Sequence, residues 1–228
     1  ATVKARTPVT SASSDGGTVT VAWASRSGEF GEIYANRYVD GSWSGSPALL
    51  SNPADTNSRA GDPILIGSAS GSAATVVWRT QVGASLGQIE SNGFTDGAWA
   101  NGPTLISLST GGGANSTDVR AVGSTDGSVV TAVWRTISGG LGAVYANRFS
   151  ASAWGGSPDL ISAAAASTAN AQSAPAIVTN PSGAQVAVAW QSGVSGNGQI
   201  VSSAFASGAW SGPELVSSAA ASATNASA

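Results

Sequence analysis

The chain has 228 residues, enough for one domain or a short array of repeats. Only 9% of the residues are charged, against a typical ~25%, and the net charge is −3; this argues against a nucleic-acid-binding protein, which needs a clustered basic face. His, Cys and Met are absent, which excludes thiol catalysis, disulfides, a His-based triad and zinc sites with the usual ligands.

The first 52 residues contain four segments with the pattern of β-strands. These are residues 4–11 (KARTPVTS), 19–23 (VTVAW), 33–38 (IYANRY) and 40–51 (DGSWSGSPALLS). The turn SSDGG separates the first two, because Asp and Gly favour tight turns. In the second segment Val19, Val21 and Trp23 share one face and Ala22 lies on the other, which indicates a strand that is covered on both sides.

Three later units repeat this pattern in the same order. The second unit has strand-like segments at 62–68, 74–78, 89–94 and 96–107, the third at 118–124, 130–134, 144–149 and 150–162, and the fourth at 174–180, 186–190, 200–205 and 207–217. We therefore divide a single domain, residues 1–228, into repeats at about 1–52, 53–108, 109–163 and 164–228.

Three aromatic series keep the repeats in register. The first is Trp23, Trp78, Trp134 and Trp190, with steps of 55, 56 and 56 residues. The second is Trp43, Trp99, Trp154 and Trp210, with steps of 56, 55 and 56, and the third is Tyr38, Phe94, Phe149 and Phe205. Because the first series ends an apolar strand, we expect it to form the core between repeats. The second series follows a turn, so we expect it to be more exposed.

Four-stranded units of this length, repeated around an axis, are typical of the blades of a β-propeller. The sequence therefore predicts an all-β, four-bladed β-propeller with four antiparallel strands per blade. An open β-solenoid and a pair of β-sandwiches are the alternatives, although a solenoid usually has a shorter period. Closure is open at this stage: one chain forms a four-bladed ring, two chains form an eight-bladed ring as a homodimer, or the array belongs to a longer protein.

The location is predicted from the composition. No apolar run reaches the ~20 residues that span a bilayer, so we expect no membrane span. The surface is low in charge and rich in Ser, Thr, Ala and Gly, which favours a secreted, extracellular protein. The absence of Met leads us to expect a processed product or an excised segment. No cofactor and no metal site is predicted.

The recurring text VxVAW, IYANRY, GSW and LLS resembles the tandem repeats of secreted bacterial propeller-like proteins, over all four units. A looser resemblance is to fucose-type lectin propellers, which also have an apolar strand, a following strand and a DG-x-W turn. That resemblance implies glycan sites between blades, built from an Arg, a carboxylate or Gln, and an aromatic ring. No unit shows the full set in the order of the lectins, and the SSDGG and STDGS turns resemble the sialidase Asp-box only in part.

The candidate ligand-binding residues follow from repeat position and side-chain chemistry. Guanidinium groups and amides hydrogen-bond hydroxyls, and indole rings stack on sugars. The candidates are Arg26, Arg79 and Arg135 after the first Trp series, Glu32 and Glu90 in the third strand, Asn36, Arg37, Asn147 and Arg148 in the two YANR motifs, and Trp43, Trp99, Trp154 and Trp210. For the arginines and the YANR motifs, contacts between blades and inherited repeat similarity are the structural alternatives.

We predict a non-enzymatic, lectin-like module that binds glycans or a cell-surface polysaccharide through several weak sites. The alternative is a structural or adhesive repeat domain that binds protein. A third hypothesis, a glycan-cleaving enzyme, requires two carboxylates that converge on one pocket, and no such pair stands out in the sequence. We assign Asp15 and Asp126 to turns, because Asp before Gly favours them.

Overall fold

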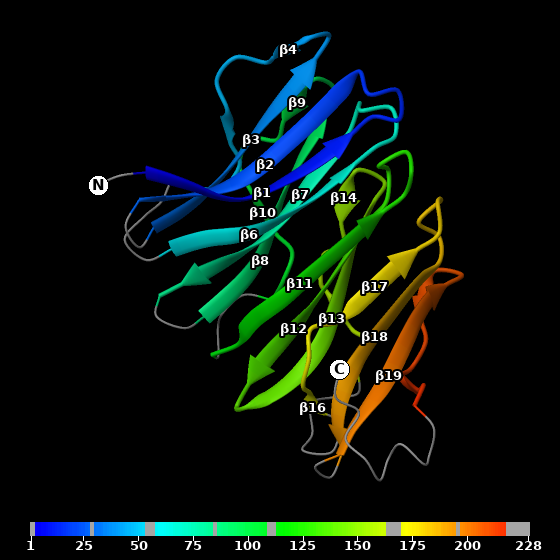
Figure 1. The fold of residues 1–228 in the computed structure, drawn as a ribbon. Helices are drawn as coiled ribbons and strands as arrows, with labels where there is room; N and C mark the ends of the chain where they lie inside the picture. The colour runs from blue at the N-terminus through cyan, green and yellow to red at the C-terminus, as the bar shows by residue number, and fades with distance from the viewer. Residues whose placement is uncertain are drawn as a thin grey trace.

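The computed structural model describes residues 3–27, 30–52, 58–83, 86–108, 113–162, 170–194 and 197–217, and this part of the chain contains strands and turns but no helix (Figure 1). The first sheet has β1 (Val3–Ala12), β2 (Thr18–Ser27), β3 (Phe30–Val39), β4 (Ser42–Trp43) and β5 (Ala48–Leu49). The second has β6 (Ser58–Gly67), β7 (Ala74–Val82), β8 (Leu86–Thr95), β9 (Ala98–Trp99) and β10 (Thr104–Leu105). The third has β11 (Asn115–Gly123), β12 (Val130–Ser138), β13 (Leu141–Ser150), β14 (Ala153–Trp154) and β15 (Asp159–Leu160). The fourth has β16 (Asn170–Ala171), β17 (Ala176–Thr179), β18 (Val186–Val194), β19 (Asn197–Ala206), β20 (Ala209–Trp210) and β21 (Glu214–Leu215).

Each repeat forms one antiparallel meander in chain order, as the sequence predicts. The first three strands pair side by side over most of their length, and the fourth position is held by two short segments on the third strand. The expected fourth strand is thus interrupted. Its middle contains Gly45, with φ of 65°, and Pro47, which has no N–H to donate to the neighbouring strand.

The turns between the first two strands confirm the assignment of Asp15 and Asp126. Asp15 Oδ1 accepts hydrogen bonds from Ser13 Oγ at 2.5 Å and from the Gly17 N–H at 3.0 Å. Asp126 accepts the same bonds from Ser124 Oγ and the Ser128 N–H. These short-range bonds fix the turn that starts the second strand.

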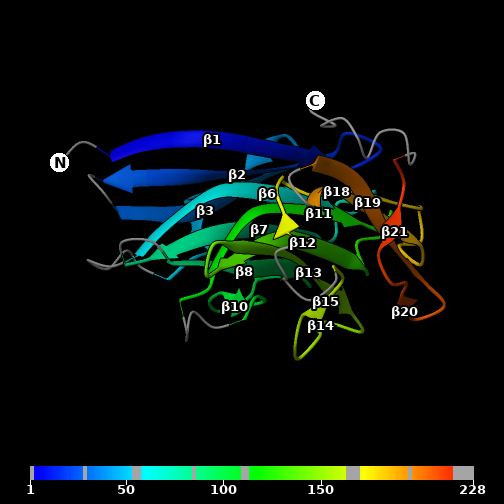
Figure 2. The same ribbon diagram turned by 90° about the horizontal axis from the view of Figure 1, so that it is seen from below.

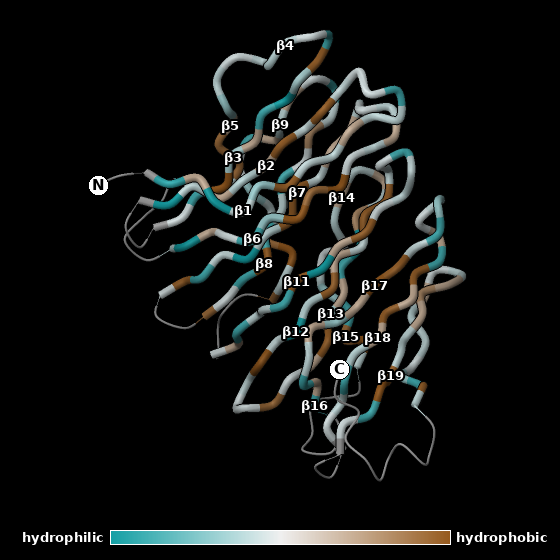
Figure 3. The backbone as a smooth tube through the Cα atoms, viewed as in Figure 1, coloured by the Kyte–Doolittle hydropathy of each residue, from teal (hydrophilic) through white to brown (hydrophobic). Residues whose placement is uncertain are grey.

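Successive sheets pack face to face through three equivalent hydrophobic clusters. Each cluster joins the Trp of the second strand to aliphatic side chains of the preceding sheet. The strands continue four residues beyond this Trp, so the expectation that the Trp ends the strand is wrong. The clusters contain Trp78 with Ile33 and Leu50, Trp134 with Ile89 and Ile106, and Trp190 with Val144 and Ile161. All three indoles are buried, which confirms them as core residues. Figure 3 shows the hydrophobic stretches along these strands.

Close approach between neighbouring sheets explains why the third strand of each of the first three sheets has a glycine near its start. A Cβ added to Gly31, Gly87 or Gly142 would lie 2.2–2.3 Å from a carbonyl oxygen on the first strand of the next sheet. Real Cβ atoms do not come so close to a backbone oxygen, so only glycine fits. The contact brings β3 beside β6, where Gly31 pairs with Arg59 in a parallel bridge.

The four sheets form a row in which the first strands β1, β6, β11 and β17 each contact the next (Figures 1 and 2). In the described residues, the fourth sheet makes no more than slight contact with the first, and the two lie at opposite ends of the row. The outer face of the fourth sheet is accordingly open: Leu50, Ile106 and Ile161 are buried, whereas the equivalent Val216 is 60% exposed. Closure of one ring by two chains stays one of the alternatives that the sequence leaves open.

Candidate functional site

The first strands of the first three sheets carry the same β-bulge. In each bulge the pairing with the second strand shifts by one residue. The first residue inside the bulge has a left-handed backbone: Thr7, Asp62 and Asp118 have φ of 47°, 54° and 57°. Aspartate tolerates this conformation better than most residues, and a bulge redirects the side chain out of the regular alternation. The bulges therefore direct the side chains of Thr7, Asp62 and Asp118 away from the sheets. They lie at the inner edge, where the first strands of neighbouring sheets contact one another.

These side chains line a cavity of about 440 Å³ that we call the inner-edge cavity. Its wall consists of Thr7, Asp62, Pro63, Ile64, Arg79, Thr117, Asp118, Val119 and Arg120. The residues come from three successive sheets, so only the packed repeats create it. The cavity brings two carboxylates and two guanidinium groups together, and its size is within the range of small-molecule sites.

Arg79 is half-buried in the wall of this cavity and bridges two sheets. Its Nε donates to Ser116 O at 2.9 Å, and its Nη2 donates to Asn115 Oδ1 at 3.1 Å. Burial lowers the pKa of Arg79, and the negative charges of Asp62 and Asp118 act in the opposite direction. The guanidinium group is thus held by β11 beside both carboxylates.

Arg135 occupies the equivalent position in the third sheet and holds Asp118. Its Nη2 lies 2.8 Å from Asp118 Oδ2 in an ion pair, and its Nε donates to the same oxygen at 3.0 Å. Its Nη1 donates to Gln172 O of the fourth sheet at 2.9 Å. Arg26 also lies at such a junction, since a Cβ on Gly61 of the next sheet would be 3.4 Å from its Nη2. The three arginines therefore lie where each sheet meets the first strand of the next.

Sequence reasoning selected Arg79 and Arg135 but missed Asp62 and Asp118. The signal was present, because both aspartates begin the first-strand segments DPILIGS and DVRAVGS at equivalent repeat positions. What the sequence could not show is the bulge, which turns both carboxylates into one cavity.

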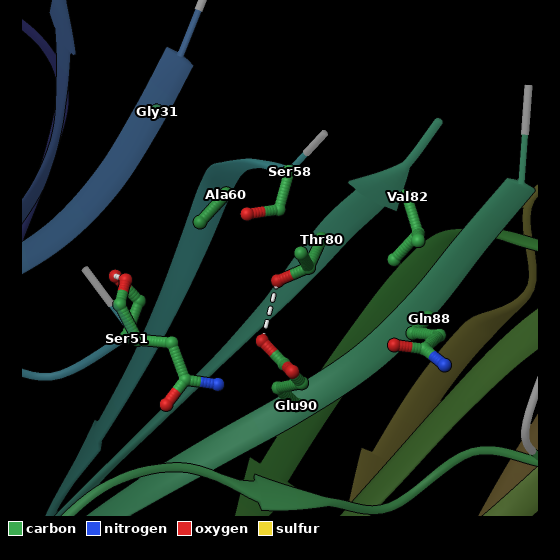
Figure 4. Close-up of a pocket in the computed structure, with 9 residues that line it drawn as sticks. Gly31, Ser51, Ser58, Ala60, Thr80, Val82, Gln88 and Glu90 are labelled. Atoms are coloured by element: carbon green, nitrogen blue, oxygen red, sulfur yellow. Dashed lines mark hydrogen bonds between the residues drawn. The ribbon is translucent and has the colours of Figure 1, made fainter. Parts of the chain in front are cut away.

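Glu90 lies in a second, smaller pocket of about 180 Å³ between the first and second sheets (Figure 4). It is 9% exposed, and its Oε2 accepts hydrogen bonds from Trp78 Nε1 at 3.1 Å and Thr80 Oγ1 at 2.5 Å. Figure 4 shows Gln88 and Ser51 on the walls of the same pocket. Glu90 takes the place of the tyrosines that stack on Trp23 and Trp134 in the first and third sheets. It is the one carboxylate in the lining of this pocket.

The other third-strand carboxylate, Glu32, lies near the first Trp series in the first sheet. Its Oε2 accepts a hydrogen bond from Tyr34 Oη at 2.9 Å. Burial, followed by this bond, raises the pKa of Tyr34. The structure therefore does not bring Glu32 and Glu90 into the inner-edge cavity.

The YANR motifs lie in the outer half of two interfaces between sheets. Arg37 donates to Thr20 Oγ1 and to Gly71 O, and its guanidinium carbon lies 3.8 Å from the centre of the Phe94 ring. Arg148 makes the same contacts with Thr131, Gly183 and Phe205, with 3.9 Å to the ring. Asn36 and Asn147 accept hydrogen bonds from the backbone N–H of these arginines. Both motifs thus connect one sheet to the next.

The second Trp series lies at the outer edge of the sheets, as predicted from the turns. Trp43 is 52% exposed, and the other three are partly buried. Each packs edge-on against the aromatic residue of its own third strand, with ring centres 5.4–5.7 Å apart. None of the four lines the inner-edge cavity; Trp154 instead lines a groove between the second and third sheets.

Within the described ranges, no group of three or more Asp and Glu side chains is placed to hold a metal ion. The same residues form no helix that could cross a membrane.

No known protein family matches the sequence, and no curated protein is similar enough to match it. Solved structures do share the fold. A sialidase of Trypanosoma rangeli with bound sialic acid has a TM-score of 0.53 at 12% identity, over 93% of this chain and 37% of the sialidase. An α-L-arabinofuranosidase of Fusarium graminearum with an iminosugar inhibitor has a TM-score of 0.50 at 12% identity, over 94% of this chain and 67% of that enzyme. This chain thus spans about two thirds of the arabinofuranosidase and just over a third of the sialidase.

The comparison confirms an all-β, propeller-like fold. It also corrects the prediction of a lectin-like or adhesive protein without enzymatic activity, because both of these structures, a sialidase and an α-L-arabinofuranosidase, are enzymes. The prediction rested on symmetric placement of Arg and Trp, and several of those arginines hold neighbouring sheets together instead. Identities of 12% establish the fold alone, so the activity of this chain has to be argued from its own site.

Proposed function

We propose that the chain is a glycoside hydrolase whose site is the inner-edge cavity. The observation that carries this proposal is the convergence of Asp62 and Asp118, from adjacent first strands, on one cavity. Most glycoside hydrolases use two carboxyl groups that flank the scissile bond. The pocket around Glu90 offers one carboxylate and cannot supply both roles.

The surroundings of the two aspartates assign different roles to them. Asp118 is held in a fixed position by its ion pair with Arg135, so we assign it the role of base or nucleophile toward the anomeric carbon. Asp62 lines the same cavity without an ion pair in the described residues, and we assign it the remaining role, at the leaving oxygen. Arg79 and Arg120 supply N–H groups for sugar hydroxyls.

The substrates to test first come from the proteins that share the fold, which act on arabinofuranosides and sialosides. The resemblance to secreted bacterial repeat proteins and the low surface charge support action outside the cell, on polysaccharides, and we include this location in the proposal.

The test is hydrolysis of 4-nitrophenyl glycosides, beginning with the α-L-arabinofuranoside, by the purified chain. Asp62→Asn and Asp118→Asn should each lower kcat by about 10²–10⁴-fold, since each removes one proton-transfer or nucleophilic group. Asparagine also tolerates the left-handed backbone of both positions. Asp159→Asn, an exposed aspartate of β15, is the matched control and should leave the rate unchanged. Absence of hydrolysis across a broad glycoside panel, or equal rates in all three variants, would rule the proposal out.

A further inference from the structure

The three interfaces between sheets differ in one respect. At the first and third interfaces, an arginine of the third strand lies over a phenylalanine of the next sheet: Arg37 over Phe94 and Arg148 over Phe205. At the second interface, the equivalent position is Gly93, and the equivalent ring is Phe149. The middle interface therefore has the aromatic ring but lacks the cation.

The middle interface has a groove of about 510 Å³, which we call the outer groove. Among its lining residues are Thr75, Asn92, Gly93, Leu105, Phe149 and Trp154. A cation is attracted to the face of an aromatic ring, and planar guanidinium groups are the common partners. Phe149 lines this groove, whereas Phe94, which lines a cavity of about 570 Å³ at the first interface, and Phe205 each have a guanidinium group over the ring.

The first and third interfaces, which an arginine occupies, have hydrogen-bond acceptors with equivalents at the middle interface, which has no arginine at this position. Arg37 and Arg148 each donate to a threonine hydroxyl of the neighbouring strand and to a glycine carbonyl in the turn of the next sheet. The equivalent threonine at the middle interface is Thr75, which lies opposite Gly93 and lines the outer groove. The equivalent glycine is Gly127, which has the same left-handed turn backbone as Gly71 and Gly183 but is not among the lining residues of the groove.

One buried acceptor in the lining of the outer groove has no donor. Asn36 and Asn147 use their Oδ1 atoms to accept the backbone N–H of the following residue, at 2.7 and 2.8 Å. Gly93 also has a backbone N–H, so the loss of the arginine side chain does not by itself explain the difference at Asn92. Asn92 is 3% exposed, and its Oδ1 has no hydrogen-bond partner in the described structure. Its Nδ2 is fully used, with bonds to Leu50 O, Ala100 O and Gly102 O. A buried acceptor without a donor costs free energy that a bound donor would recover.

We propose that the outer groove is a binding site for an alkylguanidinium group, which lies on Phe149 and donates to Thr75. The occupied interfaces are the template, because each shows a threonine hydroxyl and a ring around a guanidinium whose carbon lies 3.8–3.9 Å from the ring centre. The group is supplied by a free alkylguanidine or by an arginine side chain of a peptide. The site is independent of the inner-edge cavity, which has no lining residue in common with it.

The experiment titrates ethylguanidinium, at concentrations too low to denature the chain, and measures stoichiometry by calorimetry and amide shifts by NMR. One site is expected, with shifts centred on Gly93 and Phe149. Butylammonium should bind more weakly, because it lacks the planar set of donors. A Gly-Arg-Gly peptide forms the second arm: tighter binding than ethylguanidinium identifies a peptide arginine as the source, and equal or weaker binding identifies a free guanidine.

Three variants make the result specific. Gly93→Arg should abolish the site and raise the melting temperature, since its own side chain takes the place of the ligand; a Cβ at Gly93 has no neighbour closer than 4.0 Å. Arg37→Gly, the matched variant, should create a second site at the first interface and double the stoichiometry. Phe149→Leu should weaken binding by about threefold through loss of the cation–π contact. No binding to the wild type, or binding that is unchanged in Gly93→Arg, would refute the proposal.

Discussion

The inner and outer edges of the sheets use arginine in different ways. At the inner edge, Arg79 and Arg135 connect consecutive sheets and lie beside carboxylates at bulges, and Arg79 lines the cavity shared by three sheets. At the outer edge, Arg37 and Arg148 fill the first and third interfaces with contacts to rings, hydroxyls and carbonyls. Arginine therefore holds neighbouring sheets together at the outer edge. At the inner edge it holds the sheets together and also contributes charge to the candidate site.

The largest effect is expected from the core that both edges share. Trp134→Ala should lower the free energy of unfolding by about 3–5 kcal/mol, because it empties a fully buried position between two sheets. Trp43→Ala, at a half-exposed position with one edge-on contact to Tyr38, should cost about 1 kcal/mol. Urea unfolding of both variants measures the difference. Equal losses would mean that the interfaces do not carry the stability.

A smaller effect is expected at the outer edge. Arg37→Ala should lower the free energy of unfolding by about 2 kcal/mol, because it removes two charge-assisted hydrogen bonds and a ring contact from a buried position. The control is Arg120→Ala, an exposed arginine that bonds only to the carbonyl of its neighbour Val119 and should change stability by less than about 0.5 kcal/mol. If Arg37→Ala lowers the free energy of unfolding no more than Arg120→Ala does, the outer arginines do not hold the sheets together.

The smallest effect concerns the turns, where pH is the probe. Hydrogen bonds from Ser124 and then Ser128 lower the pKa of Asp126 from 3.8 to about 2. Because the folded pKa lies below the unfolded one, the charged turn stabilises the fold above about pH 4, and this contribution is lost as the pH falls toward 2. Asp126→Ser introduces the residue type of the equivalent turns in the second and fourth units.

The melting temperature of the Asp126→Ser variant should therefore fall less between pH 5 and pH 2 than that of the wild type. Parallel melting curves at each pH check this. A wild-type curve that is no steeper than that of the variant would contradict the assigned turn.

The sequence predicted the fold well because the signals were local and repeated. A Trp that ends an apolar segment every 55 or 56 residues predicts equivalent sheets, and Trp78, Trp134 and Trp190 are indeed buried between them. Gly31 illustrates what repetition alone could not explain: its reason is a carbonyl of the next sheet 2.3 Å from where a Cβ would be.

The candidate site was predicted less well, because it depends on long-range geometry. Asp62 and Asp118 are 56 residues apart and share a cavity only because each sits at a bulge of a packed inner strand. The arginines were selected for their ability to bind sugar hydroxyls. Their donors turned out to be directed largely to backbone carbonyls of the next sheet, as for Arg148 and Gly183.

The most direct test of the account is the position of a bound iminosugar of arabinose configuration in a crystal of the Asp62→Asn chain. The account predicts the sugar ring in the inner-edge cavity, with Asp118 next to the anomeric position and the guanidinium of Arg79 at its hydroxyls. An iminosugar found against Glu90 or in the outer groove, with the inner-edge cavity empty, would contradict it.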